Sequence, residues 1–514
     1  MTKMKRYILF ITILSLSSLI YGQGGKTVTD HAAMELNFAK SLWFNSSNAA
    51  GMGITPLSDY NIVSAKYALK SGDFKLQQSG DKETGLHFNT NGALKLGKSY
   101  LWGDFNFVDQ SYKGTKYNTN SFDPCYYMPY SVSDPNLSDW RRQIYDLSLR
   151  AAAPIGERVL LGIYANYTNK KGAKQIDPRS VPYNYSIFVQ PSLVFRASPE
   201  HSFGLSFSYS NSYDRAETSN NDSQTDQNVY VMKGLGHYSS GMVGGIGGLR
   251  AFYNKGNLIG GAFQYGYTGS YNLLLDVDYR YQVIDVFQTP SKPYRMGTTK
   301  NNTIDVNFQA MFPGETSHKV SANFYKRIVD GIEFIQEEDR SEVVARWKTV
   351  AKFIRSNYSY QSASIGYDLF LGTDNSYDWR LGLMADYSDR ADIYYMPEST
   401  LDTKNLFGEF YAKKNFRFNT GALLFGLNLG YNNNRGGSYK YGGPDPASPV
   451  VTDFYAKDIK FLTSDFIKIG ADMNLSFAVG AKSSVLLGVN WQMLSSSGGG
   501  GNRNFLTASL GLLF

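Results

Sequence analysis

The feature that most constrains the fold is an alternation of apolar and polar residues that recurs along most of the chain. In "FIKIGADMNLSF", residues 466–477, Ile467 and Ile469 fall on one side of the alternation and Lys468 and Asp472 on the other. Successive side chains of a strand point to opposite faces, so the segment predicts a strand with one apolar and one charged face. Such a strand fits a wall between lipid and a wet interior.

Further segments follow the same rule: residues 159–167, 203–209, 379–387, 423–431 and 485–493. Soluble sandwiches also alternate, but they seldom need strands of about ten residues or more that close on aromatics. We therefore predict an all-β fold made of a single transmembrane antiparallel β-barrel. Closure of the sheet would satisfy every backbone donor and acceptor within the protein.

The connections between these segments alternate between short and long. Short turns are predicted at 97–98, 154–157, 197–200, 254–257, 313–317, 372–376, 415–417 and 480–483. Long polar connections are predicted at 113–141, 170–183, 214–241, 272–301, 335–357 and 433–463. Outer-membrane barrels have short periplasmic turns and long extracellular loops, so this pattern predicts about 18 strands, with 14 or 16 as alternatives.

Composition supports strands over membrane helices. The chain has 39 Tyr, 32 Phe and 50 Gly, but only 16 Pro and one Cys, Cys125, which excludes an internal disulfide framework. After residue 22 no stretch has the 18 or more consecutive apolar residues of a spanning helix, and the mean hydropathy is −0.33. This hydropathy criterion does not detect membrane-spanning strands, because their apolar residues alternate with polar ones.

The first 22 residues are predicted to be a cleaved signal peptide, with basic Lys3, Lys5 and Arg6 before an apolar run and a cut after Gly22. Removing these three cations changes the formal charge from +7 to 7 − 3 = +4. So small a charge favours neither nucleic acid nor a polybasic membrane patch. We expect export through the inner membrane to the outer membrane.

A short segment, residues 23–58, precedes the barrel predicted for 59–514 and is a candidate plug of the lumen. Within it, "WFNSSNAAGMG", residues 43–53, resembles the N-P-A-G-M stretch of the long-chain fatty-acid transporter family, with Ala49 where that family has Pro. The resemblance implies a hatch inside the barrel and a hydrophobic ligand that moves through the wall. More broadly, the chain resembles large uncharacterised Gram-negative outer-membrane barrels.

Charged residues on the polar faces are candidates for the lining of a polar lumen, because exposure to lipid would be costly. They are Lys66, Arg150, Arg380, Asp386, Lys468 and Asp472. The alternative is a structural network that packs a filled barrel.

Neither a metal site nor catalysis is predicted. His31 and Glu35 stand four residues apart on a predicted helix, but no third ligand is close in sequence, so solvation or packing is the preferred reading. His87 and the strand serines leave a lipid-modifying barrel enzyme as a minor alternative. No cofactor is expected.

The carboxyl terminus resembles the signal by which outer-membrane barrels are recognised for insertion. In "NFLTASLGLLF", Leu506, Leu510, Leu512 and Phe514 fall on one apolar face. We predict that this segment is the last strand, pairs with the first, and is read by the barrel assembly machinery.

The leading functional prediction is a passive, porin-like channel or a hydrophobic-ligand transporter. The alternative is a non-conducting accessory barrel that works beside a receptor, a secretion machine or a surface lipoprotein. A segment of 36 residues is much shorter than the plug of TonB-dependent receptors, so energised import by this chain alone is not expected. Expected contacts are outer-membrane lipid and lipopolysaccharide, and no nucleic acid.

Overall fold

The computed structural model describes residues 30–119, 128–222, 224–244, 249, 251–288, 292–341, 346–373, 375–479 and 483–514. The predicted signal peptide, residues 23–29 and Cys125 lie outside these ranges. Among the described residues, no helix is long and apolar enough to cross a membrane.

The chain forms a closed antiparallel barrel of 18 strands, which confirms the predicted fold and strand number. In order around the wall these are β1 (Tyr60–Ser71), β2 (Lys82–Leu96), β3 (Ser99–Thr115), β5 (Ser138–Ile155), β6 (Val159–Lys174), β7 (Arg179–Arg196), β8 (His201–Ser219), β11 (Ala251–Thr268), β12 (Asn272–Gln288), β13 (Tyr294–Phe312), β14 (Thr316–Asp339), β15 (Arg346–Gly372), β16 (Tyr377–Tyr395), β17 (Glu398–Phe418), β18 (Gly421–Lys440), β19 (Phe466–Ala478), β20 (Ser484–Ser496) and β21 (Asn502–Leu513). Each strand pairs with its neighbours in sequence within this set.

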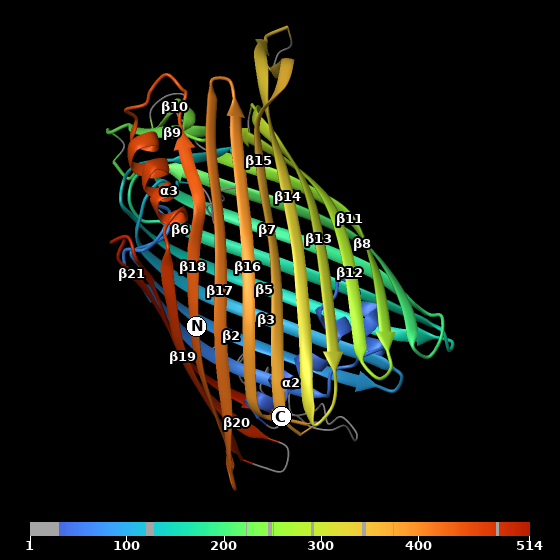
Figure 1. The fold of residues 1–514 in the computed structure, drawn as a ribbon. Helices are drawn as coiled ribbons and strands as arrows, with labels where there is room; N and C mark the ends of the chain where they lie inside the picture. Colours follow the sequence, from blue (N-terminus) through green and yellow to red (C-terminus); the bar gives the residue numbers. More distant parts are fainter. Residues whose placement is uncertain are drawn as a thin grey trace, which may run out of the picture.

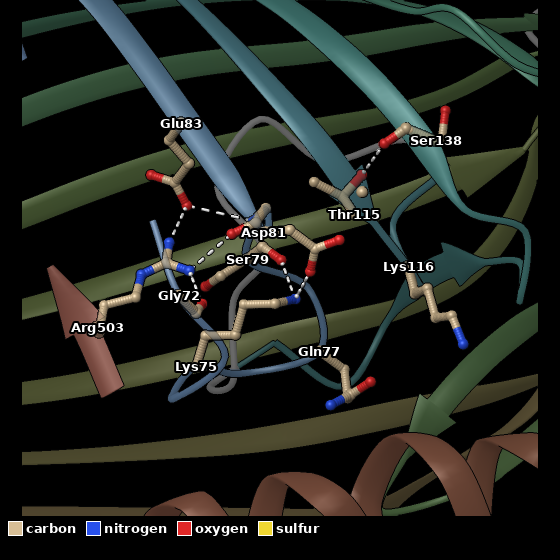
Figure 2. Close-up of polar contacts among 12 residues, drawn as sticks. Gly72, Lys75, Gln77, Ser79, Asp81, Glu83, Thr115, Lys116, Ser138 and Arg503 are labelled. Atoms are coloured by element: carbon tan, nitrogen blue, oxygen red, sulfur yellow. Dashed lines mark hydrogen bonds and ion pairs between the residues drawn. The ribbon is translucent and has the colours of Figure 1, made fainter. Parts of the chain in front are cut away.

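The barrel closes between its first and last strands. Ile62 of β1 stands opposite Leu513 of β21, and the backbone N–H of Asn61 donates to the carbonyl of Phe514 at 2.8 Å. At the other end of this seam, Figure 2 shows the buried Arg503 guanidinium tying β21 to the β1–β2 connection. It donates to the carbonyl of Gly72 at 2.9 Å and to Glu83 at 3.0 Å.

Eight connections of two to five residues lie at one end of the barrel, which we call the short-turn end. Six of them fall where the sequence predicts short turns. The other two predictions are wrong in place: residues 254–257 lie inside β11 and 415–417 inside β17, and the turns are at 269–271 and 419–420. The count of strands is unaffected because one turn replaces another.

The opposite end is more varied than predicted. Its connections run from two residues, 396–397, to the 220–250 segment. Three predicted long connections, 170–183, 272–301 and 335–357, are largely strand. Strands β14 and β15 are 24 and 27 residues long, much longer than a bilayer requires.

The outer face of the barrel is apolar. On β8, Leu205 and Phe207 are 60% and 54% exposed, and on β18 Leu427 and Leu429 are 54% and 57% exposed. These residues belong to the apolar faces that alternation predicts. An exposed apolar belt of this extent on a closed barrel is typical of a surface that meets lipid.

Residues 30–58, which we call the N-terminal segment, lie inside the short-turn end (Figure 1). They form α2 (His31–Lys40), η1 (Leu42–Asn45) and η2 (Ala49–Gly53). Asp30 caps α2 by accepting a hydrogen bond from the backbone N–H of Ala33 at 2.7 Å. Ala32, Ala33, Leu36 and Ala39 are buried and no other residue of the helix is fully exposed, so the helix is covered on all sides, as a helix inside a barrel must be.

The opposite end carries a second set of elements, which we call the cap. It consists of a small sheet of β4 (Ser131–Ser133), β9 (Gln227–Gly234) and β10 (His237–Val243), together with η3 (Val450–Tyr455) and α3 (Ala456–Leu462). Figure 1 shows α3, β9 and β10 at the end of the barrel opposite α2. Elements inserted between barrel strands therefore lie over part of this end, which we call the cap end.

Candidate functional site: the N-terminal segment and the luminal chamber

Apolar side chains of the N-terminal segment pack against strands around the circumference of the barrel. Trp43, 1% exposed, belongs to a buried cluster with Leu160, Leu274 and Phe370. Phe44 belongs to another, which reaches strands β1, β2, β5, β20 and β21. Because these strands span most of the wall, the segment fills the short-turn end rather than lying along one side of it.

The wall has small sockets for this packing. A Cβ added at Gly266 of β11 would lie 2.6 Å from Cζ2 of Trp43, and one added at Gly162 of β6 would overlap the backbone of Ala50. Any larger side chain at either position must displace the N-terminal segment or distort the strand. The close fit shows that the segment is an integral part of the folded barrel.

A partly buried carboxylate joins the segment to the opposite wall. Glu35 of α2 accepts hydrogen bonds from Lys413 at 2.6 Å, Arg380 at 2.9 Å and the Tyr377 hydroxyl at 2.6 Å. Burial by itself would raise the pKa of the Glu35 carboxyl, but Lys413 and Arg380 hold it below its ordinary value. The segment is thus anchored in its charged form.

A second polar anchor lies at the turn before η2. Asp276 of β12 accepts from the backbone N–H of Ser47 at 2.8 Å and from its hydroxyl at 2.7 Å. Gln264 of β11 donates to the same carboxylate at 2.8 Å and accepts from Asn48 at 2.8 Å. Every polar group of this buried network has a partner, as a stable buried network requires.

Above this turn, toward the cap end, lies a polar chamber of about 470 Å³. Its floor is Asn45, Ser46 and Ser47 of the N-terminal segment, and strands β5, β6, β7, β8, β12 and β13 supply its walls. A second hollow of about 230 Å³ shares Asp278 and Arg280 with it. The two hollows adjoin within the barrel, and the N-terminal segment lies beneath the larger one.

The cap is packed on the barrel by aromatic and polar contacts. Tyr117 stacks on Phe454 of η3 with ring centroids 4.9 Å apart, and its hydroxyl donates to Asp453 at 2.6 Å. His237 of β10 is bonded through Nε2 to the Ser399 hydroxyl at 2.8 Å. Buried clusters also join Val231 of β9 to Val286 of β12, and Leu235 to Val329 of β14, so the cap rests on strands from several parts of the wall.

The predicted lining residues divide into groups. Arg150 borders the chamber and donates to the carbonyl of Phe44, while Arg380 binds Glu35. Asp472 lies 3.9 Å from the ammonium of Lys413, so it belongs to the Glu35 cluster. Lys468 pairs with a carboxylate of β17 at 2.8 Å.

The remaining two lie apart from these groups. Lys66 of β1 stands opposite His87 and Ser509, and Asp386 of β16 stands opposite Phe407 and Ser364. The role of all six residues as the lining of a conducting lumen stays a prediction.

Sequence reasoning missed the residues that organise the chamber. Asp276, Asp278 and Arg280 fall in 272–301, which was interpreted as a loop, although they alternate with Val277 and Tyr279 in the pattern used elsewhere. Applying the alternation to this segment would have found them.

The described residues contain no group of three or more His, Cys, Asp or Glu side chains placed to hold a metal ion. The oxygens of Glu35 instead face cations and a hydroxyl, and Nε2 of His31 is buried without a partner. The His237–Ser399 pair is buried, Ser399 being 1% exposed, so its hydroxyl is not open to a substrate. His87 has no serine among the hydrogen-bond partners described for it.

A family model described as "Family of unknown function (DUF6850)" matches residues 49–514. No curated protein matches. Among solved structures, the chain is similar to the ferric preacinetobactin receptor BauA of Acinetobacter baumannii, at 9% identity and a TM-score of 0.38 over 88% of this chain and 81% of that one.

It is also similar to the outer-membrane transporter YddB of Escherichia coli, at 6% identity and a TM-score of 0.39 over 87% and 80% of the two chains. A mutant of the monoaromatic hydrocarbon channel TodX matches at 9% identity and a TM-score of 0.31 over 96% and 98%. The resemblance of residues 43–53 to long-chain fatty-acid transporters is not confirmed by these matches.

Proposed function

The chain belongs to the family of unknown function DUF6850, so its role must be argued from its own geometry, and we propose that it is an outer-membrane transport barrel that is closed at rest. The apolar belt on the outside of an 18-stranded barrel supports placement in a bilayer. A barrel of this size has room for an aqueous lumen unless something fills it. Here the N-terminal segment fills the short-turn end.

The observation that carries the proposal is the manner in which that segment is held. Apart from its chain connection to β1, the segment is held by non-covalent contacts: the glycine positions that fit its side chains, a charged anchor at Glu35 and a polar anchor at Asp276. Contacts of this kind can be exchanged for others when a ligand or a partner competes for them. We therefore assign the segment the role of a removable plug and the polar chamber the role of the solute path.

Conductance in planar bilayers tests this proposal. Wild-type protein is expected to stay silent, whereas Gly266→Leu, which puts a side chain where Trp43 lies, should open a steady pore. Gly261→Leu is the matched control, because it is on the same strand and an added Cβ would meet nothing closer than 3.7 Å. Heat-modifiable migration in gels would establish that each variant is a folded barrel.

A second candidate function is favoured by one observation, the cap over the other end of the barrel. A barrel filled at one end and partly covered at the other suits an accessory protein that offers a rigid surface to a membrane partner. The same experiment separates the two: a folded Gly266→Leu variant that remains silent, as does a variant without residues 30–58, would overturn the transport proposal and leave the accessory one.

A further inference from the structure

The polar chamber has the size of a small-molecule site. Its volume of about 470 Å³ lies within the range of roughly 300–1,000 Å³ that small-molecule sites occupy. Polar atoms converge on it from six strands and from the N-terminal segment. Convergence of polar groups from separate elements is what fixes the orientation of a bound molecule.

The charges around the chamber are of both signs, and each is engaged by groups of the wall or of the N-terminal segment. Arg280 pairs with Asp278 through three contacts, two at 3.1 Å and one at 2.5 Å, and Asp305 accepts hydrogen bonds from two asparagines at 3.0 Å and 2.7 Å. Asp276 is engaged by Ser47 and Gln264. Arg150 donates to the carbonyl of Phe44 and packs against the Tyr164 ring. With three carboxylates and two guanidinium groups side by side, an anion and a cation would each meet charges of their own sign, so neither is strongly favoured.

What the lining offers instead is a dense mixture of donors and acceptors. Ser186, Ser210, Asn166 and Asn307 add hydroxyls and amides, each of which can both donate and accept. On one side, the rings of Tyr164 and Phe188 lie with centroids 5.7 Å apart and give the chamber a local apolar surface.

We propose that the chamber binds a neutral, polyhydroxylated solute of the sugar class, as the cargo of the transport function proposed above. A hydroxyl group also donates and accepts, so adjacent hydroxyls of one sugar match side-chain amides and carboxylates without any net charge. The C–H face of a sugar ring fits against an aromatic face such as Tyr164 or Phe188. The floor of the site is the N-terminal segment, so the bound solute touches the plug itself.

Saturation-transfer NMR tests this inference on the full chain, in a detergent without a sugar headgroup. The probes are sucrose and glucose as neutral sugars, glucose 6-phosphate as an anion and spermidine as a cation. Wild-type protein and Gly266→Leu are both measured, so that access from the short-turn end does not limit binding. Transfer to sucrose or glucose is expected, and little transfer to spermidine.

The neutral double variant Asp278→Asn/Arg280→Gln should weaken sugar binding by about tenfold or more, because charge-assisted hydrogen bonds are lost while the net charge is kept. Ser186→Trp should abolish it by filling the chamber. The matched control is Asp109→Asn/Arg141→Gln, an ion pair of 2.9 Å outside the chamber, which should leave binding unchanged.

Three results would overturn the inference: no transfer to either sugar, stronger binding of the phosphate or the polyamine, or equal loss in the chamber and control pairs. The transport function is judged separately, by the conductance of Gly266→Leu. An open pore without sugar binding would remove the sugar inference alone, and sugar binding in a folded but silent Gly266→Leu would remove the transport proposal alone.

Discussion

At the scale of single residues, Glu35 shows how partners from distant strands define a role. Its spacing from His31 on one helix is that of a pair of metal ligands, and sequence reasoning weighed it as such. Its actual partners, Arg380 and Lys413, lie 345 and 378 positions away in the chain. No local pattern carries that information, because it depends on which strands the closed barrel brings beside α2.

Removing this carboxylate should loosen the N-terminal segment. Glu35→Ala leaves two cations without their shared partner, and we expect a loss of about 1–3 kcal/mol in the seating of the segment. Trypsin cleavage after Lys40, within α2, should therefore be faster in the variant than in wild type.

Asp378→Asn is the matched control, because Asp378 forms an exposed ion pair with Arg417 at 3.3 Å and such pairs contribute little. Equal cleavage rates in wild type and Glu35→Ala would show that Glu35 does not seat the segment.

At the scale of elements, the alternating pattern predicts strands best where one face meets lipid. It placed 466–477 and 423–431 correctly, because their apolar faces lie in the outer belt. It failed at 335–357, where β14 and β15 continue beyond the apolar belt. At about 3.3 Å per residue, β15 is roughly 90 Å long, against an apolar band of about 25 Å. Outside that band both faces are wet, so no alternation marks the strand.

The cap should lose stability in mild acid. Burial, with Arg355 and Lys233 nearby, lowers the pKa of His237 to about 4. The ring stacks on Tyr394 with centroids 4.0 Å apart. Since the folded state keeps the ring neutral while an opened state protonates near pH 6.5, the cap loses up to about 3 kcal/mol as the pH falls from 6.5 to 4 and no more below that.

Hydrogen exchange reports this change, as protection factors of amides in β9 and β10 at a series of pH values. His237→Gln, whose amide can keep the hydrogen bond to Ser399, should flatten the dependence, whereas His318→Gln, on the outer face of β14, should not. Protection in wild type that is constant between pH 7 and 4 would contradict this account.

At the scale of the whole molecule, the two ends of the barrel should face opposite sides of the membrane. An epitope inserted between Arg340 and Ser341, in the connection beyond β14, is expected to bind antibody on intact cells. An epitope in the turn at 97–98 should be stained only after the membrane is permeabilised. Staining of intact cells at the turn, but not at Arg340, would reverse the proposed orientation.

The three scales differ in how much of the structure could be predicted from the sequence. The number of strands and their outward faces follow from the local alternation of apolar and polar residues, so both can be predicted from the sequence. The chamber joins side chains of the N-terminal segment, such as Ser47, to Asp276 and Arg150 on distant strands. Its composition depends on how the wall closes and how deep the segment sits, and neither follows from periodicity.

Occupation of the barrel at both ends has a consequence for the cell that would carry it. The outer membrane protects a bacterium because bulky toxic molecules cross it slowly, and every open pore weakens that protection in proportion to its copy number. On the proposed placement, a barrel filled by its own N-terminal segment and partly covered by its own cap adds no standing leak. The number of copies could then follow the demand for the solute without any loss of the permeability barrier.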